Sequence, residues 1–183
     1  MVGCGLRSFA IASKPLQTSA NHRHPLQTMH FGIALGSNLV DRGENIRRGI
    51  ALLLERVPGI QLKASAPVYE TEPVDCAPGT QAFLNTVIEI EADCLPHDLH
   101  THLKAVEAAL GRPEQRERNS PRTLDLDLLY ADAFVSDDPE LILPHPRLHL
   151  RRFVLQPLAD IRPDLILPGQ TQTNAELLAG LID

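Results

Sequence analysis

The chain has 183 residues, of which 43% are hydrophobic and 22% are charged, and its formal net charge is −6. This length and composition are those of one globular domain with a single core, which excludes disordered and fibrous proteins. The negative charge and the aromatic content of 4% argue against a nucleic-acid-binding protein, which needs Lys and Arg for phosphates and aromatic rings for bases. Because no apolar run approaches the roughly 20 residues of a membrane helix, we expect a protein that binds neither nucleic acid nor membrane.

Two further features of the composition bear on where the protein resides. Residues 1 to 28 contain three of the 17 basic residues and none of the 23 acidic ones, so they are either a transit-like leader or an extension from an upstream start. We favour the upstream start, and in either case expect a disordered or leader-like extension before a domain that spans residues 29 to 183. The three cysteines, Cys4, Cys76 and Cys94, lack C-x-x-C spacing, which favours the reducing cytoplasm over a disulfide framework or a zinc site.

The first part of the domain alternates strand and helix patterns. Residues 30 to 35, HFGIAL, form a short apolar run before the turn residues GSN, which predicts a strand. From residue 41 to residue 57 the apolar side chains recur at the spacing of one helix face, and the dipeptide Pro-Gly then ends the helix. Residues 60 to 71 predict a second strand. The proline-rich residues 70 to 82 have the length of a functional loop.

The middle of the chain predicts a strand, a helix and a loop. Residues 83 to 93, FLNTVIEIEAD, form a strand that turns its even-numbered apolar residues to one face and Phe83 and Asn85 to the other. Residues 96 to 110 form a helix with an apolar face and a separate polar flank. That flank holds His100, Lys104 and Glu107. The polar residues 111 to 120 have three arginines and no periodicity, so they predict a loop.

The last part of the chain begins with a strand that contains Asp125 and Asp127. A proline-bounded loop, DDPELILPHPRLH, follows it, and then a short helix around residues 148 to 156 and an amphipathic helix near residues 173 to 181. The whole order is β-α-β-β-α-β with a helical tail. It predicts an α+β fold, a compact sandwich with helices packed on a mostly antiparallel sheet.

The pair Asp125 and Asp127, in the run SPRTLDLDLLYAD, is the first candidate for chemistry. Residues two apart in a strand point to the same side, so the carboxylates would share a face while Leu124, Leu126 and Leu128 supply the core contact. Their Cα atoms would lie about 7 Å apart. Two like charges at that distance favour a neutralising cation, and oxygen ligands favour Mg²⁺. The alternative is that both acids face solvent on an amphipathic strand, which a D-x-D pattern alone would favour.

Arginines surround this strand in the sequence. Three lie in the loop before it, one precedes it in PRT, and others follow in PHPRLHLRR. Guanidinium groups that grip phosphate oxygens, combined with paired metal ions, are typical of phosphoryl-transfer enzymes. The chain has no G-x-x-x-x-G-K-[ST] motif, which excludes a P-loop nucleotide fold.

The motifs GSNL, FLN and, above all, PRTLDLDLLYAD followed by LPHPRLHLRRFVLQPL resemble those of the 6-hydroxymethyl-7,8-dihydropterin pyrophosphokinases of folate biosynthesis. The resemblance runs from about Phe31 to Pro168. It implies a ferredoxin-like α/β sandwich that transfers pyrophosphate from ATP to the pterin hydroxymethyl group and releases AMP, with two Mg²⁺ ions on the ATP phosphates. We expect a monomer whose partners are the small molecules pterin and ATP, and which can associate with neighbouring folate-pathway enzymes.

The resemblance also implies a role for individual residues. Asp125 and Asp127 would be the metal ligands and, with the phosphate-binding Arg112 and Arg122, the catalytic residues. The ATP-binding residues would be Lys104, Glu107, Arg112, Arg122, His145 and Arg151. The pterin-binding residues would be Thr71, Val74, Phe83, Asn85 and Phe153. From the residues alone, other interpretations stay open. Phe83 and Phe153 could be core aromatics, and His145 and Arg112 could belong to solvated loops.

Two other functions also stay open on the sequence. A two-metal phosphohydrolase would use the same aspartates with water as the nucleophile. A non-catalytic, ferredoxin-like nucleotide-binding module would tolerate loss of both aspartates. AMP formation that depends on added pterin distinguishes the pyrophosphokinase from both.

Overall fold

A central antiparallel sheet organises the chain. The computed structural model describes residues 28–73, 79–111 and 122–181. The strands of the sheet are β1 (Met29–Ser37), β2 (Gln61–Ser65), β3 (Tyr69–Thr71), β4 (Phe83–Ala92) and β5 (Asp125–Ala131). Their order is β2-β4-β1-β5, and β3 also pairs with β4.

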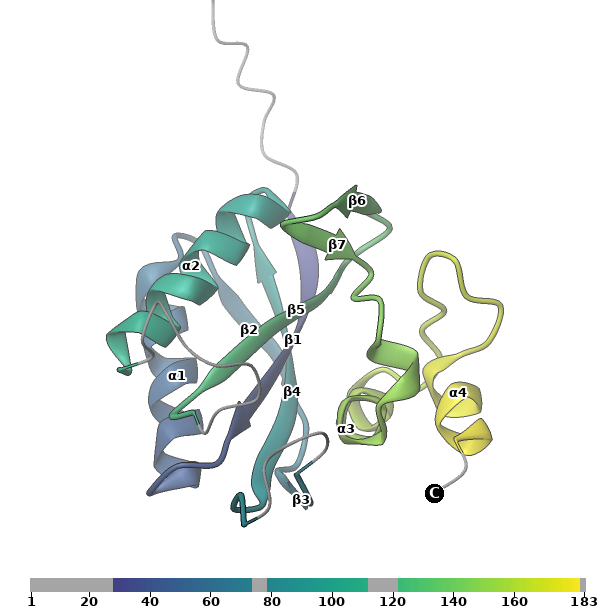
Figure 1. Cartoon of the computed structure of the whole chain (residues 1–183). Coiled ribbons are helices and arrows are strands. Elements are labelled where there is room, and N and C mark those ends of the chain that lie inside the picture. Colours follow the sequence, from purple (N-terminus) through teal and green to yellow (C-terminus); the bar gives the residue numbers. More distant parts are fainter. Residues whose placement is uncertain (1–27, 74–78, 112–121, 182–183) are drawn as a thin grey trace, which may run out of the picture.

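Helices cover both faces of this sheet (Figure 1). They are α1 (Arg42–Arg56), α2 (Pro96–Ala109), α3 (Arg152–Ile161) and α4 (Asn174–Gly180), with a 3-10 turn, η1 (Leu148–Leu150), before α3. The first two lie together on one face, and α3 lies on the other, with α4 packed against α3. A small second sheet of β6 (Ser136–Asp138) and β7 (Leu141–Leu143) follows β5. The expected α+β class is confirmed, and none of the described helices has the length and apolar composition to cross a membrane.

Two hydrophobic cores form, one on each face of the sheet, instead of the single core expected from the length. Both faces carry apolar side chains, because successive residues of a strand point to opposite sides. In β1 the large residues Phe31, Ile33 and Leu35 are buried in the core that includes α1 and α2. Ala34, on the other face of β1, packs into a second core with Leu155 of α3. Strand β4 alternates in the predicted way. Its residues Leu84, Ile88 and Ile90 belong to the first core, and Val87 belongs to the second.

Three segments differ from the expectation. Residues 60 to 71 form two strands instead of one, because Pro67 lies between β2 and β3 and cannot donate a ladder hydrogen bond. The helix expected around residues 148 to 156 is divided into η1 and α3, and α3 continues to Ile161. Residues 136 to 143, expected in a loop, form the β6–β7 hairpin. Strand β1 begins at Met29, whereas residues 1–27 of the predicted extension lie outside the described residues.

A glycine of β1 allows the sheet to pack closely beneath α3. A Cβ at Gly32 would lie 2.1 Å from the ring of the buried Tyr130. The Tyr130 hydroxyl donates to Glu89 at 2.6 Å, and Glu89 also pairs with Arg162, at the end of α3, at 3.0 Å. Burial and the hydrogen bond to Glu89 raise the pKa of Tyr130, so the hydroxyl stays a neutral donor. This chain of contacts ties the sheet to the end of α3.

We expect Gly32→Ala to lower the free energy of unfolding by about 1–3 kcal/mol, because the added methyl group must displace a buried ring. Urea denaturation followed by circular dichroism measures this change. The matched control is Gly43→Ala in α1, where a Cβ would meet nothing within 4 Å and where alanine favours the helix. Equal stability of the two variants would contradict the close packing.

Candidate active site

Strand β1 sets the layout of the face that α3 covers. Its register pairs Gly36 with Asn85 of β4 and with Asp125 of β5, and it pairs Ala34 with Asp127. Because paired residues of neighbouring strands lie side by side on one face, Asn85 and Asp125 lie on either side of Gly36, about 10 Å apart at their Cα atoms. A Cβ on Gly36 would lie 2.8 Å from Asn85 Oδ1. Only glycine therefore leaves the amide in this position.

The two aspartates of β5 share one face, as the sequence predicted. Leu124, Leu126 and Leu128 are buried in the core that includes α1 and α2. The alternate residues Asp125 and Asp127 therefore project from the opposite face. Both are only partly exposed, and charged groups of the segment before α3 act on them. The alternative that both aspartates simply face solvent on an amphipathic strand is therefore not favoured.

Arg122 links this strand to its neighbours. Its Nη1 donates to Asp125 Oδ2 at 2.6 Å, and its Cζ lies 5.4 Å from the centroid of the Phe83 ring. Asn38 holds its backbone, because the Arg122 N–H donates to Asn38 Oδ1 at 2.8 Å and the Asn38 N–H donates to the Arg122 carbonyl at 3.3 Å. Asn38 is only 1% exposed. The sequence predicts Asn38 only as a turn residue of GSN, and it does not predict these two hydrogen bonds to Arg122.

The charge of Asp127 acts on two imidazoles and a guanidinium. Burial is the main cause that lowers the pKa of His145 and of Arg151, and the negative charge of Asp127 opposes it in both cases. The same carboxylate acts on His100 of α2, whose pKa burial also lowers. The His145 N–H donates to the Leu129 carbonyl at 2.8 Å, which fixes His145 on the outer edge of β5. His100 was not a predicted site residue, and only its place on the polar flank of its helix could have signalled it.

Glu107 of α2 holds β5 between its two aspartates. Its side chain is 1% exposed, and its Oε1 accepts the Leu126 N–H at 2.7 Å. Strand β5 is the last strand on its side of the sheet, so this N–H faces away from β1 and needs an acceptor elsewhere. The other oxygen, Oε2, pairs with Lys104 at 3.2 Å. Glu107 thus reaches the aspartates through the backbone that carries them.

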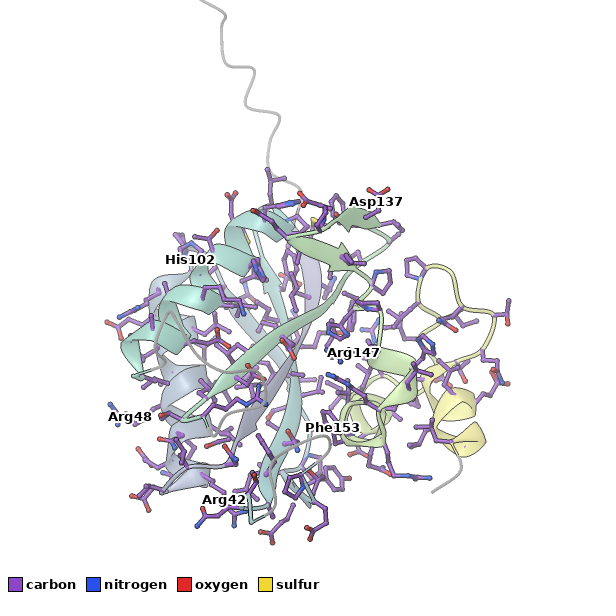
Figure 2. The ribbon with its side chains drawn as sticks, in the orientation of Figure 1. Arg42, Arg48, His102, Asp137, Arg147 and Phe153 are labelled. Carbon is purple, nitrogen blue, oxygen red and sulfur yellow. The ribbon has the colours of Figure 1, made fainter. Side chains whose placement is uncertain are left out.

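The predicted pterin residues of β3 and β4 contact one another. Asn85 is 8% exposed, and its Nδ2 donates to Thr71 Oγ1 at 2.6 Å. Thr71 is in turn the register partner of Phe83. Phe153, in the first turn of α3, lies on the side of the sheet that α3 covers (Figure 2). The centroid of its ring is 5.4 Å from the Cζ of Arg151, so a predicted pterin-binding ring lies beside a predicted ATP-binding side chain.

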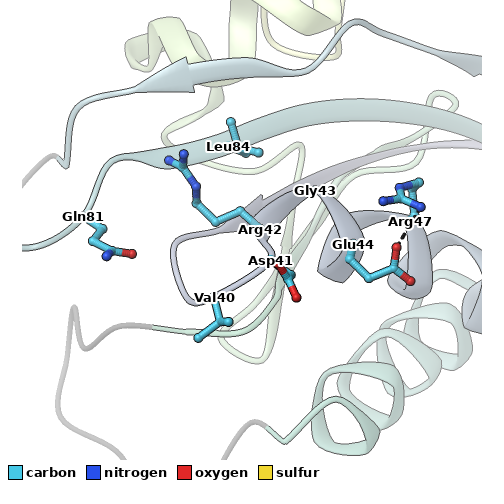
Figure 3. A pocket seen from close by; sticks show the side chains of 8 residues that line it. All are labelled: Val40, Asp41, Arg42, Gly43, Glu44, Arg47, Gln81 and Leu84. Carbon is cyan, nitrogen blue, oxygen red and sulfur yellow. Dashed lines mark ion pairs between the residues drawn. The ribbon is translucent and has the colours of Figure 1, made fainter.

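A pocket of about 480 Å³ lies at the start of α1 (Figure 3). It is lined by Val40, Asp41, Arg42, Gly43, Glu44, Arg47, Gln81 and Leu84. Its two arginines are already engaged, because Arg42 pairs with Glu70 and donates to the Ala82 carbonyl, and Arg47 pairs with Glu44. None of the predicted site residues that the structure describes lines this pocket. The chemistry is better assigned to the aspartate face of the sheet.

The aspartate pair fits a divalent ion that takes most of its ligands from elsewhere. Among residues 28–73, 79–111 and 122–181, no group of three or more His, Cys, Asp or Glu side chains is placed to hold a metal alone. Mg²⁺ commonly takes one or two carboxylates from the protein and its other oxygens from water and phosphates. Asp125 and Asp127 match that pattern. Val74 and Arg112 lie outside the described residues, so their roles stay predictions.

Solved structures share the fold at low sequence identity. A crystal structure of HPPK-DHPS in complex with substrates has a TM-score of 0.64 at 12% identity, and the match covers 84% of this chain and 43% of that chain. Plasmodium falciparum HPPK-DHPS A437G with pteroate has a TM-score of 0.66 at 14% identity, with the same coverage. This chain therefore spans less than half of either protein. At such identities the likeness shows the fold alone.

A family model and several named relatives match this chain in sequence, and all of them indicate the same family. The model of 7,8-dihydro-6-hydroxymethylpterin-pyrophosphokinase (HPPK) matches residues 32–163. The 2-amino-4-hydroxy-6-hydroxymethyldihydropteridine pyrophosphokinase of Pseudomonas aeruginosa is 40% identical over 136 residues, which are 74% of this chain and 82% of that protein. The Bacillus subtilis enzyme of the same name is 41% identical over 129 residues, 70% of this chain and 75% of that protein. The chain therefore belongs to the 7,8-dihydro-6-hydroxymethylpterin-pyrophosphokinase family.

Proposed function

We propose that this chain transfers pyrophosphate from Mg-ATP to 6-hydroxymethyl-7,8-dihydropterin and releases AMP, as a step of folate biosynthesis. The observation that carries the proposal is the family match over a segment that contains Asp125, Asp127 and Arg122 on one face of the sheet. Family membership does not favour the two alternatives, a phosphohydrolase and a non-catalytic module. Because one fold can host many functions, the family match decides here and the fold does not.

The products fix where the bonds change. AMP keeps the α-phosphate, and the pterin gains the β- and γ-phosphates, so the pterin hydroxyl oxygen must attack the β-phosphorus. The bond from that phosphorus to the oxygen shared with the α-phosphate breaks, and the hydroxyl proton is released. Such transfers need mainly alignment and neutralisation of charge on the phosphate oxygens.

The groups for that task gather around β5. Asp125 and Asp127 would hold two Mg²⁺ ions, which would neutralise the charge of the ATP phosphates. Arg122 would donate to phosphate oxygens through its planar fork. Further ATP contacts are assigned by position to Lys104, Glu107, Arg112, His145 and Arg151. Of these, Glu107 would act through the strand that it holds and through Lys104, because both its oxygens already have partners.

The pterin would lie against β3, β4 and the start of α3. The amide of Asn85 offers a donor and an acceptor to a heterocycle edge. Because Thr71 takes one N–H of that amide, the Asn85 side chain is held in one orientation, with Oδ1 over Gly36. Phe83 and Phe153 would flank the ring by stacking. Val74 is assigned to the same pocket by position.

The protein is proposed to act in the cytoplasm, beside other enzymes of folate biosynthesis. We expect a cytoplasmic monomer that can associate with other folate enzymes. Fused relatives support the association, since the Folate synthesis bifunctional protein of Arabidopsis thaliana is 39% identical over 129 residues, 70% of this chain and 26% of that protein. The HPPK-DHPS structures are of the same kind.

Incubation of the full chain with Mg-ATP should yield AMP only when hydroxymethyl-dihydropterin is added, because the pterin hydroxyl is the nucleophile. Chromatographic separation of AMP, ADP and ATP measures this directly. Asp127→Asn should reduce turnover by about a hundredfold or more, because the lost charge would act on the bound metal and phosphates. The fold should remain intact, because no hydrogen bond or ion pair to Asp127 occurs among the described residues.

Three results would contradict the proposed function. AMP without pterin would indicate a hydrolase, and no AMP under any condition would indicate a binding module. Near wild-type turnover of Asp127→Asn would remove the metal role of that residue. The control variant is Asp137→Asn, an exposed aspartate in β6, which should leave turnover unchanged.

Glu107→Ala should lower the free energy of unfolding by about 1–3 kcal/mol, because the buried Leu126 N–H loses its acceptor. It should lower kcat more than it raises the KM for ATP, since the aspartates lose their backbone support. Glu107→Gln keeps an acceptor oxygen and should recover most of both. Urea denaturation and steady-state kinetics test this. If Glu107→Ala were as stable as wild type and only its KM for ATP were raised, Glu107 would instead contact the nucleotide directly.

A further inference from the structure

One predicted metal ligand is already occupied by a predicted phosphate-binding arginine. The distance from Arg122 Nη1 to Asp125 Oδ2 is 2.6 Å, and the two side chains are 15% and 20% exposed. A charge-assisted hydrogen bond of this length, largely shielded from water, is stronger than a surface ion pair. A metal ion that approaches Asp125 must therefore displace the guanidinium or share the carboxylate with it.

The arginine is held in this position from several sides. Asn38 fixes its backbone through two hydrogen bonds, and the Phe83 ring lies beneath the guanidinium. Within the described part of the chain, the buried Arg122 Nε has no hydrogen-bond partner. An unsatisfied buried donor carries a desolvation cost that an incoming oxygen acceptor removes. Arg122 is thus prepared to accept a polyanion.

The second aspartate differs from the first. No hydrogen bond or ion pair to Asp127 occurs among the described residues, and its charge acts at longer range on His100, His145 and Arg151. A free divalent ion would therefore find one accessible carboxylate instead of two. It would also meet the positive charges of Arg122 and Arg151 nearby.

A metal ion bound to polyphosphate meets a different situation. Its phosphate oxygens accept the guanidinium donors, so Arg122 moves from a carboxylate to a phosphate and no longer opposes the approach of the metal to Asp125. Each charge keeps an opposite partner during this exchange. A free ion brings no acceptor for the guanidinium, which would be left partly buried and unpaired.

We propose that Arg122 makes the site select a divalent ion already complexed with polyphosphate over the free ion. The inference rests on the proposed function, because it assumes that Asp125 and Asp127 ligate the metal. Arg122 has opposite effects on two ligands. It opposes the binding of metal alone, and it favours the binding of the metal–nucleotide complex.

Mn²⁺ titration of the nucleotide-free full chain, followed by the electron paramagnetic resonance signal of free Mn²⁺, tests this selectivity. Arg122→Gln should bind Mn²⁺ roughly tenfold tighter than wild type, which is the scale of one charge-assisted hydrogen bond. With Mn²⁺ and the α,β-methylene analogue of ATP the order should reverse, and the variant should bind the complex more weakly. A residue with a purely structural role would not change the two affinities in opposite directions.

The control variant is Arg147→Gln, which removes an equal charge from an exposed residue with no hydrogen bond or ion pair to Asp125 among the described residues. It should tighten Mn²⁺ binding by less than about twofold, because exposed charges are screened. Arg122→Lys, a milder change, should give an intermediate affinity if Arg122→Gln does not fold.

Two results would overturn the inference. One is equal Mn²⁺ affinity of wild type and a folded Arg122 variant. The other is an equal gain in Arg147→Gln, which would indicate a general field instead of a contact. Pterin-dependent AMP formation by wild type is measured separately, so either result would remove the selectivity without touching the proposed function.

Discussion

The small residues of strand β1 determine what the sheet can present to α3. Gly32, Ala34 and Gly36 lie on that face between two strands with polar side chains. At Gly32 the free space is filled by Tyr130, which ties the sheet to the end of α3. At Gly36 the free space is occupied by the side-chain amide of Asn85 from β4, and Asp125 of β5 lies on the other side of Gly36. The small residues of β1 thus allow close packing at one end of the strand and a group of polar side chains at the other.

Hydrogen bonds from outside the sheet support the strand that carries the two aspartates. Strand β5 is a sheet edge, but Glu107 and the backbone of His145 hold its outer side. This support matters because phosphoryl transfer depends on positioning and charge more than on covalent chemistry of the protein. Burial keeps His145 and Arg151 from being fully solvated, so their interactions with incoming phosphates would be less screened than at the surface.

Local patterns in the sequence predicted the parts of the fold that depend on alternation and helix periodicity. The two faces of β4, the helix from residue 96 and the shared face of the two aspartates all follow from spacing. The break at Pro67 and the hairpin of β6 and β7 were missed, because short edge segments carry little periodicity. The partners of Glu107, Arg122 and Asn38 depend on which elements become neighbours, which no local pattern reveals. The family resemblance identified residues, but not that Arg122 and Asp125 would pair.

The central claim is that Asp125 and Asp127 together hold divalent ions against a polyphosphate. A crystal of the full chain with Mn²⁺ and the α,β-methylene analogue of ATP would test it by anomalous scattering at the manganese edge. The account predicts anomalous peaks within about 2.5 Å of oxygens from both aspartates and from the phosphates. A bound analogue whose ions contact neither carboxylate would contradict it.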